Sequence, residues 1–215
     1  MRDSKTSCQS NTDYRSAGGR SLWWFPWFVI FGAMALRASV AKAKGASMLI
    51  DDFTDPGLTS KLGTSWRGVS DRVMGGVSEA RVTHRVDDGQ PSLALGGDVR
   101  LENNGGFIQA SLNLAPATGT FDASGYRGLR LLAQGKGEAY SVHLRTPDAV
   151  RPWQSYRAHF IADAEWRSIE LPFTEFAPYR LEPPMDTRRL KRLGIVAIGR
   201  AFTADLKLAR LEFYR

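Results

Sequence analysis

Hydrophobic and polar residues alternate with a period of two along much of this chain, which is the pattern of half-buried β-strands. The clearest cases are residues 106–114, 139–146 and 155–162. In each, apolar side chains occupy one side of the strand and mostly polar side chains the other, as when one sheet face packs on a core. The apolar positions are Ile108, Ala110, Leu112, Leu114, Tyr140, Val142, Leu144, Tyr156, Ala158 and Phe160.

The same reading predicts ten strands between turns rich in glycine and proline. They are Met48–Phe53, Val77–Val86, Ser92–Leu95, Gly106–Leu114, Gly128–Ala133, Ala139–Thr146, Ser155–Ala162, Trp166–Leu171, Gly194–Ile198 and Leu206–Tyr214. Helix is scarce, and the best candidate is a short piece over Thr187–Leu193 with Asp186 or Thr187 as N-cap. Many short strands at close spacing predict one all-β domain, a sandwich or a barrel, over residues 44–215.

The first 43 residues follow a different pattern. Basic residues precede a 15-residue apolar run over residues 22–36, and the small residues of Ala38–Ala43 follow it. A basic start, a short apolar stretch and an A-x-A site are typical of a signal peptide, which we expect to be cleaved near Ala41 or Ala43. The alternative is a membrane anchor formed by residues 22–36. We therefore expect an exported, periplasmic or extracytoplasmic domain, with membrane contact only through this segment if it is retained.

This segment also accounts for most of the net charge. Of the formal charge of +7, the first 43 residues contribute four, because they hold six basic and two acidic side chains. The remaining domain is only mildly basic, so its charge does not favour nucleic-acid binding. The one cysteine, Cys8, also lies in this segment, which leaves the domain without a disulfide, a thiol nucleophile or a thiolate metal site.

Signatures of catalysis are absent. The sequence has no G-x-S-x-G, no P-loop and no H-E-x-x-H. His84, His143 and His159 have no second ligand at metal-binding spacing. We therefore expect no catalytic residue, no cofactor and no metal ion.

Two short segments each place polar residues ahead of a glycine pair and a predicted strand. They are "SDRVMGG" at residues 70–76 and "ENNGGF" at residues 102–107. Asp71 is expected to accept hydrogen bonds from loop amides, and Gly75 and Gly76 to supply backbone angles barred to other residues. We interpret both loops as mainly structural. Their residues are Asp71, Arg72, Gly75, Gly76, Glu102, Asn103, Asn104, Gly105 and Gly106.

Residues 66–78, "WRGVSDRVMGGVS", followed by "LENNGGF" at 101–107 and "WRSIELPFTEF" at 166–176, closely resemble the complex I intermediate-associated protein 30 family. The resemblance extends from about Leu49 to the C-terminus. It implies a jelly-roll fold similar to galactose-binding and carbohydrate-binding modules. It also implies a non-catalytic role as an assembly factor, with protein partners.

A candidate binding surface follows from the alternation. Polar side chains of residues 139–146 and 155–162 share one face of two strands that we expect to be neighbours, and Trp153 lies just before the second. This face is either ordinary solvated surface or a binding site. As a binding site it would take a protein partner or, alternatively, a glycan. The candidate binding residues are His143, Arg145, Trp153, Arg157 and His159.

Overall fold

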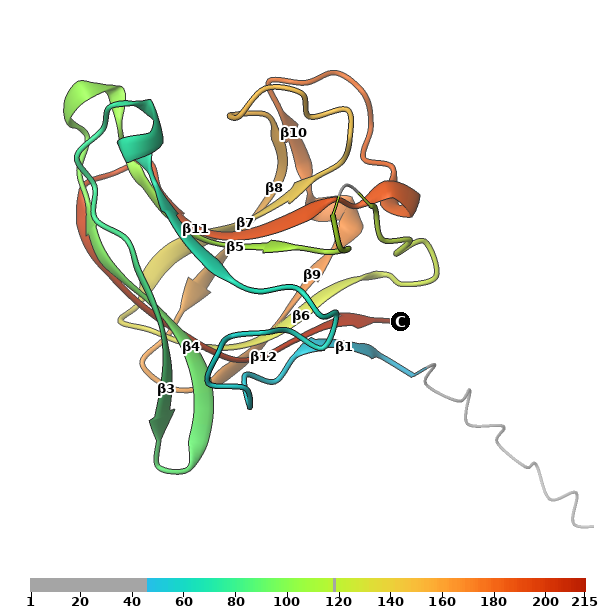
Figure 1. Cartoon of the computed structure of the whole chain (residues 1–215), viewed down its shortest axis with the longest axis horizontal. Coiled ribbons are helices and arrows are strands. Elements are labelled where there is room, and N and C mark those ends of the chain that lie inside the picture. The colour runs from blue at the N-terminus through green and yellow to red at the C-terminus, as the bar shows by residue number, and fades with distance from the viewer. Residues whose placement is uncertain (1–45, 118) are drawn as a thin grey trace, which may run out of the picture. The chain divides into compact units, whose positions relative to one another are not determined.

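A computed structural model describes residues 46–117 and 119–215 of the chain. Within these residues it forms two antiparallel six-stranded sheets packed face to face (Figure 1). The predicted leader, its apolar run and Cys8 lie outside the described residues. No helix in the described residues is long and apolar enough to cross a membrane.

The first sheet is built around the 13-residue strand β12. The early part of β12 pairs with β4, its later part with β6, and its end also with β1. The strand order is β3-β4-β12-β6-β9, with β1 added on β12. The strands are β1 (Met48–Asp51), β3 (Arg81–Asp87), β4 (Gln90–Val99), β6 (Gly128–Gln134), β9 (Arg167–Pro172) and β12 (Phe202–Tyr214).

The second sheet has the order β10-β8-β7-β11-β5-β2. Its strands are β2 (Arg67–Ser70), β5 (Phe107–Asn113), β7 (Glu138–Arg145), β8 (Ser155–Ala162), β10 (Ala177–Tyr179) and β11 (Arg192–Ile198). β11 lies between β5 and β7, so Gly194 is opposite both Ser111 and His143. Strands that are far apart in sequence therefore meet in the middle of this sheet.

The hydrophobic core lies between the two sheets. All ten apolar positions that the alternation assigned to one side of the strands are buried there. Each fully buried large apolar side chain contributes about 1.5–3 kcal/mol relative to exposure, which makes this alternation the main determinant of the register. The prediction of an all-β fold is confirmed, and the fold is a β-sandwich.

All ten predicted strands occur, but β3 begins at Arg81 and not at Val77, and β4 and β12 extend well beyond the predicted Ser92–Leu95 and Leu206–Tyr214. Two further strands and one helix were predicted wrongly. Strands β2 and β10 were missed, since both are short and lie at the edges of the second sheet. The predicted helix over Thr187–Leu193 is wrong beyond its first turn. Only Thr187–Arg189 forms a 3-10 helix, η4, capped by the Asp186 side chain. Leu190 then bridges to Phe121 and Arg192 opens β11, because extended backbone buries Leu190 and Leu193 in the core.

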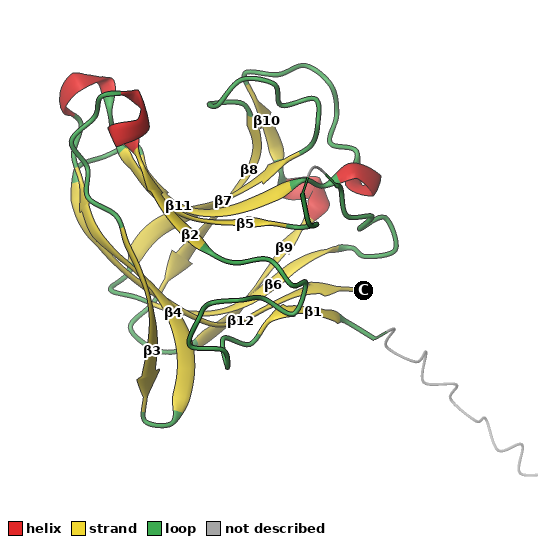
Figure 2. Cartoon of the chain, in the orientation of Figure 1, coloured by secondary structure: helices red, strands yellow, loops and turns green. Residues whose placement is uncertain are grey.

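Four single-turn 3-10 helices connect the described strands (Figure 2). Two of them, η1 (Asp71–Met74) and η2 (Glu102–Asn104), come from the two glycine-pair loops and lie side by side at one end of the sandwich. The others are η3 (Phe173–Glu175) and η4. The loops recognised from the sequence thus meet in space.

Candidate binding groove

The face of the second sheet that points away from the core carries a groove of about 430 Å³. Its floor is formed by β5, β7 and β11, through Gln109, His143, Gly194 and Val196. One wall is the segment leading into β8, with Tyr179 of β10 beside it. The opposite wall is built from the two glycine-pair loops. The volume lies in the range of ordinary ligand sites.

The glycine-pair loops are joined by the carboxylate of Asp71, which is fully buried. It accepts hydrogen bonds from the amide nitrogens of Ser78 at 2.9 Å and Gly106 at 2.6 Å, and from the Ser78 hydroxyl. Burial opposes ionisation of this carboxyl, but these hydrogen bonds outweigh it and lower its pKa. Asp71 does accept from loop amides, as expected, and two of them, Gly106 and, at 3.4 Å, Phe107, belong to the other loop.

The glycines around Asp71 are required for two different reasons. Gly75 and Gly106 have φ of 88° and 125°, which L-residues rarely adopt. Gly76 and Gly105 instead leave room for the carboxylate, since a Cβ would lie 2.3 Å from Asp71 Cγ or 2.4 Å from Asp71 Oδ2. The expectation of special backbone angles is therefore confirmed for Gly75 and wrong for Gly76.

Three further polar side chains of these loops make contacts at the protein surface. Arg72 pairs with Glu79, and Glu102 pairs with Arg100. Asn103, at φ 56°, donates from Nδ2 to the carbonyl of Gly75 at 3.2 Å, a second direct link between the loops. Asn104 ends η2. Of these contacts, that of Asn103 joins the two loops, and the apolar side chains of both loops line the groove.

Those apolar side chains were not selected from the sequence. Val73, Met74 and Leu101 line the groove, and each is about half exposed or more, at 72%, 49% and 51%. Trp153 faces them from the opposite wall at 46%. Of the seven large hydrophobic side chains exposed within the described residues, these four line the groove. The sequence offered one signal of this apolar wall, a valine and a methionine placed between an arginine and a glycine pair in a loop.

Two arginines hold the loop that carries Trp153. Arg145 donates to the carbonyls of Ala149 at 2.6 Å, Arg151 at 2.9 Å and Pro152 at 3.0 Å. The Arg157 guanidinium lies 3.4 Å from the ring centroid of Tyr179 and donates to the carbonyl of Trp153 at 3.3 Å. Both arginines therefore position this wall in addition to lining the groove.

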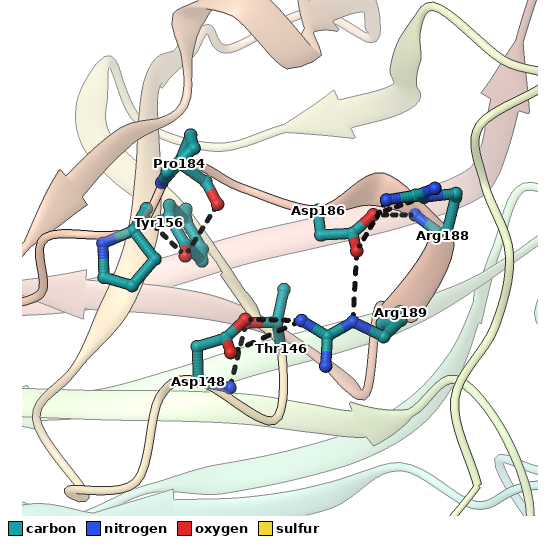
Figure 3. A network of polar contacts seen from close by, with 8 residues as sticks. Thr146, Asp148, Tyr156, Pro184, Asp186, Arg188 and Arg189 are labelled. Atoms are coloured by element: carbon teal, nitrogen blue, oxygen red, sulfur yellow. Dashed lines mark hydrogen bonds and ion pairs between the residues drawn. The ribbon is translucent and has the colours of Figure 1, made fainter.

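Figure 3 shows how the base of the same loop is braced. Arg189 pairs with both Asp148 and Asp186, and Asp148 accepts from the Thr146 hydroxyl at 2.9 Å. Hydrogen bonds from Arg188, and then from Arg189, lower the pKa of Asp186 to about 2. The Tyr156 hydroxyl donates to the carbonyl of Pro183 at 2.9 Å. Nearby carboxylates thus compensate the positive charges of Arg188 and Arg189 in η4.

His143 lies in the floor of the groove and is only 9% exposed. Burial, followed by the charges of Arg157, His159 and Arg145, lowers its pKa to about 3, so the imidazole is neutral at physiological pH. Its Nε2 has no hydrogen-bond partner among the described residues. Beside it, Gly194 makes room for the Gln109 amide, which a Cβ there would meet at 2.4 Å.

The structure brings four of the five predicted binding residues together. His143, Arg145, Trp153 and Arg157 all line the groove, and β7 and β8 are neighbours with His143 opposite Arg157. His159 is exposed on β8, opposite Ser141, and does not line the groove. Ser141 is buried and donates to the Ala158 carbonyl, so this face is less solvated than the alternation suggested. Within the described residues, no group of three or more potential metal ligands occurs.

The sequence matches the family described as Complex I intermediate-associated protein 30 over residues 52–208. This span includes both glycine-pair loops and nearly all of the sandwich. This chain belongs to the complex I intermediate-associated protein 30 family. No curated protein matches it significantly.

Solved structures show how the family's fold is related to others. A family 11 carbohydrate-binding module of a cellulosomal cellulase of Clostridium thermocellum superposes with a TM-score of 0.60 at 12% identity, over 79% of this chain and 94% of that module. A family 30 module of a cellulosomal cellulase of the same organism has a TM-score of 0.55 at 16% identity, over 78% and 96%. These similarities establish the jelly-roll fold of this family member, and nothing about its ligand.

Another structure of the family 11 module was solved in complex with a β-1,3-1,4-mixed-linked tetrasaccharide. Its TM-score is 0.58 at 12% identity, over 78% of this chain and 95% of that one. At 12% identity, this comparison supports a shared architecture and does not assign that ligand to this chain.

Proposed function

We propose that this chain is a non-catalytic binding domain whose ligand site is the groove of the second sheet, and that it binds a segment of a protein partner. The observation that carries this proposal is the position of Val73, Met74, Leu101 and Trp153 around one groove. Exposed apolar side chains that gather at one place mark interaction surfaces, whereas scattered ones do not.

The rigidity of the walls supports binding. Asp71 ties one wall together through four donors, and Arg145 ties the other through three carbonyls. A preformed site loses little conformational entropy when its ligand arrives, so more of the contact energy appears as affinity. Tryptophan and arginine, both present here, are the side chains that most often dominate such interfaces.

The exposed side chains favour a protein over a glycan. Valine, methionine and leucine bury well against apolar side chains of a peptide, and sugars have few such groups to offer. The family is named for its association with an intermediate of complex I, which also supports a protein partner.

A glycan remains the second candidate because Trp153 is exposed on the groove and structural relatives are carbohydrate-binding modules. A sugar-binding platform generally offers two or more exposed aromatic faces. Three aromatic residues line the groove, but one face of Tyr179 is covered by Arg157 and Phe107 is only partly exposed. Among the described residues, Trp153 is the one aromatic of the seven exposed large hydrophobic side chains. The groove is therefore a weaker platform for sugars than for a peptide.

We also propose that the domain acts outside the cytoplasm, as an assembly or binding factor of the cell envelope. The basic start, short apolar run and A-x-A site of residues 1–43 support this location. Intact-mass measurement of the protein from its native envelope tests it. A mature chain beginning near Lys42 or Lys44 is expected, and a species that retains residues 22–36 would indicate the anchored alternative.

A matched pair of valines tests the groove itself. Val73 lines it at 72% exposure, while Val86 on β3 of the other sheet is 58% exposed. Envelope proteins captured by the full chain should be retained by Val86→Ser and reduced about tenfold or more by Val73→Ser, because only Val73 would be desolvated by the partner. Equal capture by both variants, or binding to a glycan array without protein capture, would contradict a groove that binds a protein segment.

A further inference from the structure

The charged side chains that line the groove are all of one sign. Among the residues that the structure describes, three arginines line it, Arg145, Arg157 and Arg192, and no aspartate or glutamate does. None of the three takes part in any ion pair among residues 46–117 and 119–215, although many other arginines there do. Their nearest hydrogen-bond acceptors are carbonyl, hydroxyl and amide oxygens, which carry no net charge.

Two of these arginines face one another across neighbouring strands. Arg192 of β11 is directly opposite Arg145 of β7. Burial, and secondly the charge of Arg192, lowers the pKa of Arg145. Like charges at directly opposite positions destabilise a sheet, so this pair costs stability in the unliganded domain. A bound anion would convert the repulsion into two attractions.

Arg192 has the freest donors of the three. Its Nε donates to Asn113 Oδ1 at 3.0 Å, and its two terminal nitrogens make no hydrogen bond to a described residue. Arg145 and Arg157 direct several of their donors to loop carbonyls. A carboxylate above Arg192 would therefore find free donors there and the positive field of Arg145 close by.

His143 adds a neutral polar group to the same floor. Its side chain is buried, with 9% exposure, and its Nε2 has no hydrogen-bond partner among the described residues. An unpaired buried polar atom costs free energy, which a ligand group hydrogen-bonded to it would recover. Arg157 lies opposite His143 on β8, so this atom is close to the positive side chains.

We propose that the occupant of the groove is an acidic peptide segment, which places a carboxylate at Arg192 and Arg145 and apolar side chains against Val73, Met74 and Leu101. This inference rests on the proposed function, because it names the chemistry of the protein segment that the groove takes. A free inorganic anion would satisfy the arginines but would leave the apolar wall exposed. An acidic glycan would do the same, since it has no aliphatic side chains for that wall.

The test begins with the full chain and a phage-displayed library of random 12-residue peptides. Enriched peptides are expected to combine at least one Asp or Glu with aliphatic residues. The strongest one is synthesised together with its amide counterpart, in which Asn and Gln replace the acids. The acidic peptide should bind about tenfold more tightly, as charge-assisted hydrogen bonds to arginine are roughly twice as strong as neutral ones. Its affinity should also fall with added salt.

Two arginine variants locate the charge effect. Arg192→Gln should weaken the acidic peptide about tenfold and leave the amide peptide nearly unchanged. Arg85→Gln, which alters an exposed arginine on β3 of the other sheet, should change neither. This pattern in a binding titration would assign the carboxylate to Arg192, because loss of fold would weaken both peptides alike.

The contrary outcomes separate the two proposals. Enriched peptides without acidic residues that are insensitive to Arg192→Gln but weakened by Val73→Ser would overturn the acidic ligand and leave a peptide-binding groove. Peptides whose binding is unchanged by Arg192→Gln and by Val73→Ser would show that the groove is not their site. Binding of polygalacturonate, with no enrichment of peptides, would overturn both proposals in favour of an acidic glycan.

Discussion

The carboxylate of Asp71 accepts a hydrogen bond from the amide nitrogen of Gly106 at 2.6 Å, although the two residues are 35 positions apart in the sequence. Through this contact the loop before β3 and the loop before β5 become one unit. That unit holds Val73, Met74 and Leu101 at the edge of the groove.

Replacing Asp71 with asparagine is expected to destabilise the domain. Asparagine has the same shape, but its NH₂ group would face N–H donors and its oxygen carries no charge. Loss of charge-assisted hydrogen bonds in a buried site costs about 2–3 kcal/mol. Urea denaturation of Asp71→Asn measures this loss. Asp122→Asn is the control, since exposed Asp122 accepts from the nearby Ser124 amide and should lose less than about 1 kcal/mol. Equal losses would contradict the role given to Asp71.

The stability lost when a glycine of the same loop is replaced by alanine should depend on why that glycine is required. Gly76→Ala places a methyl group 2.3 Å from Asp71 Cγ and is expected to cost about 2 kcal/mol or more. Gly75→Ala meets no atom within 4 Å but is strained at φ 88°, so about 1 kcal/mol is expected. Gly96→Ala has neither problem, with its nearest atom at 3.7 Å, and serves as the control. Thermal denaturation gives the ranking, and a harmless Gly76→Ala would refute the steric argument.

His143 should make stability depend on pH. Its pKa is about 3 in the folded protein, against about 6.5 in the unfolded chain, so protons bind preferentially to the unfolded chain between these values. The stability that this neutral histidine contributes is fully present above pH 6.5 and is lost as pH falls. Between pH 7.5 and 5.5 the free energy of unfolding should drop by about 1.4 kcal/mol from this group.

The comparison that isolates His143 is urea unfolding of the wild type and His143→Gln at both pH values. The variant should lack the part of the pH dependence that His143 causes, while titration of the other groups remains. An identical drop in both proteins would show that His143 is not the group responsible.

Arg145 is expected to act mainly on the loop of residues 149–153. Arg145→Gln removes the donors to three carbonyls, so this loop should open more often. Chymotrypsin cleavage after Trp153 should accelerate several-fold in native buffer, with Arg85→Gln cleaved at the wild-type rate. An unchanged rate would contradict this role of Arg145 and leave the loop to its other contacts, those of Arg157 and the Asp148–Arg189 pair. Trp153→Ala is the better probe of ligand contact, since it leaves these hydrogen bonds in place.

The sequence by itself determined the fold class and the buried faces of β5, β7 and β8. Alternation of apolar and polar residues specifies a face locally, and Tyr140, Val142 and Leu144 occupy the core for that reason. It also indicated that Asp71 caps loop amides and that His143, Arg145 and Arg157 share a face. Two edge strands and the end of the predicted helix were misjudged, because short strands carry little alternation and Leu190 is extended to reach the core.

Only the tertiary structure decided how these local features combine. Strand order is a long-range property, and the placement of β11 between β5 and β7 sets Arg192 opposite Arg145 and Gly194 opposite His143. The same packing joins the two glycine-pair loops through Asp71 and turns Val73, Met74 and Leu101 toward Trp153 across one groove. A one-dimensional pattern records which side of a strand a residue takes. Which residues from distant strands then face one another depends on how the whole chain packs its core.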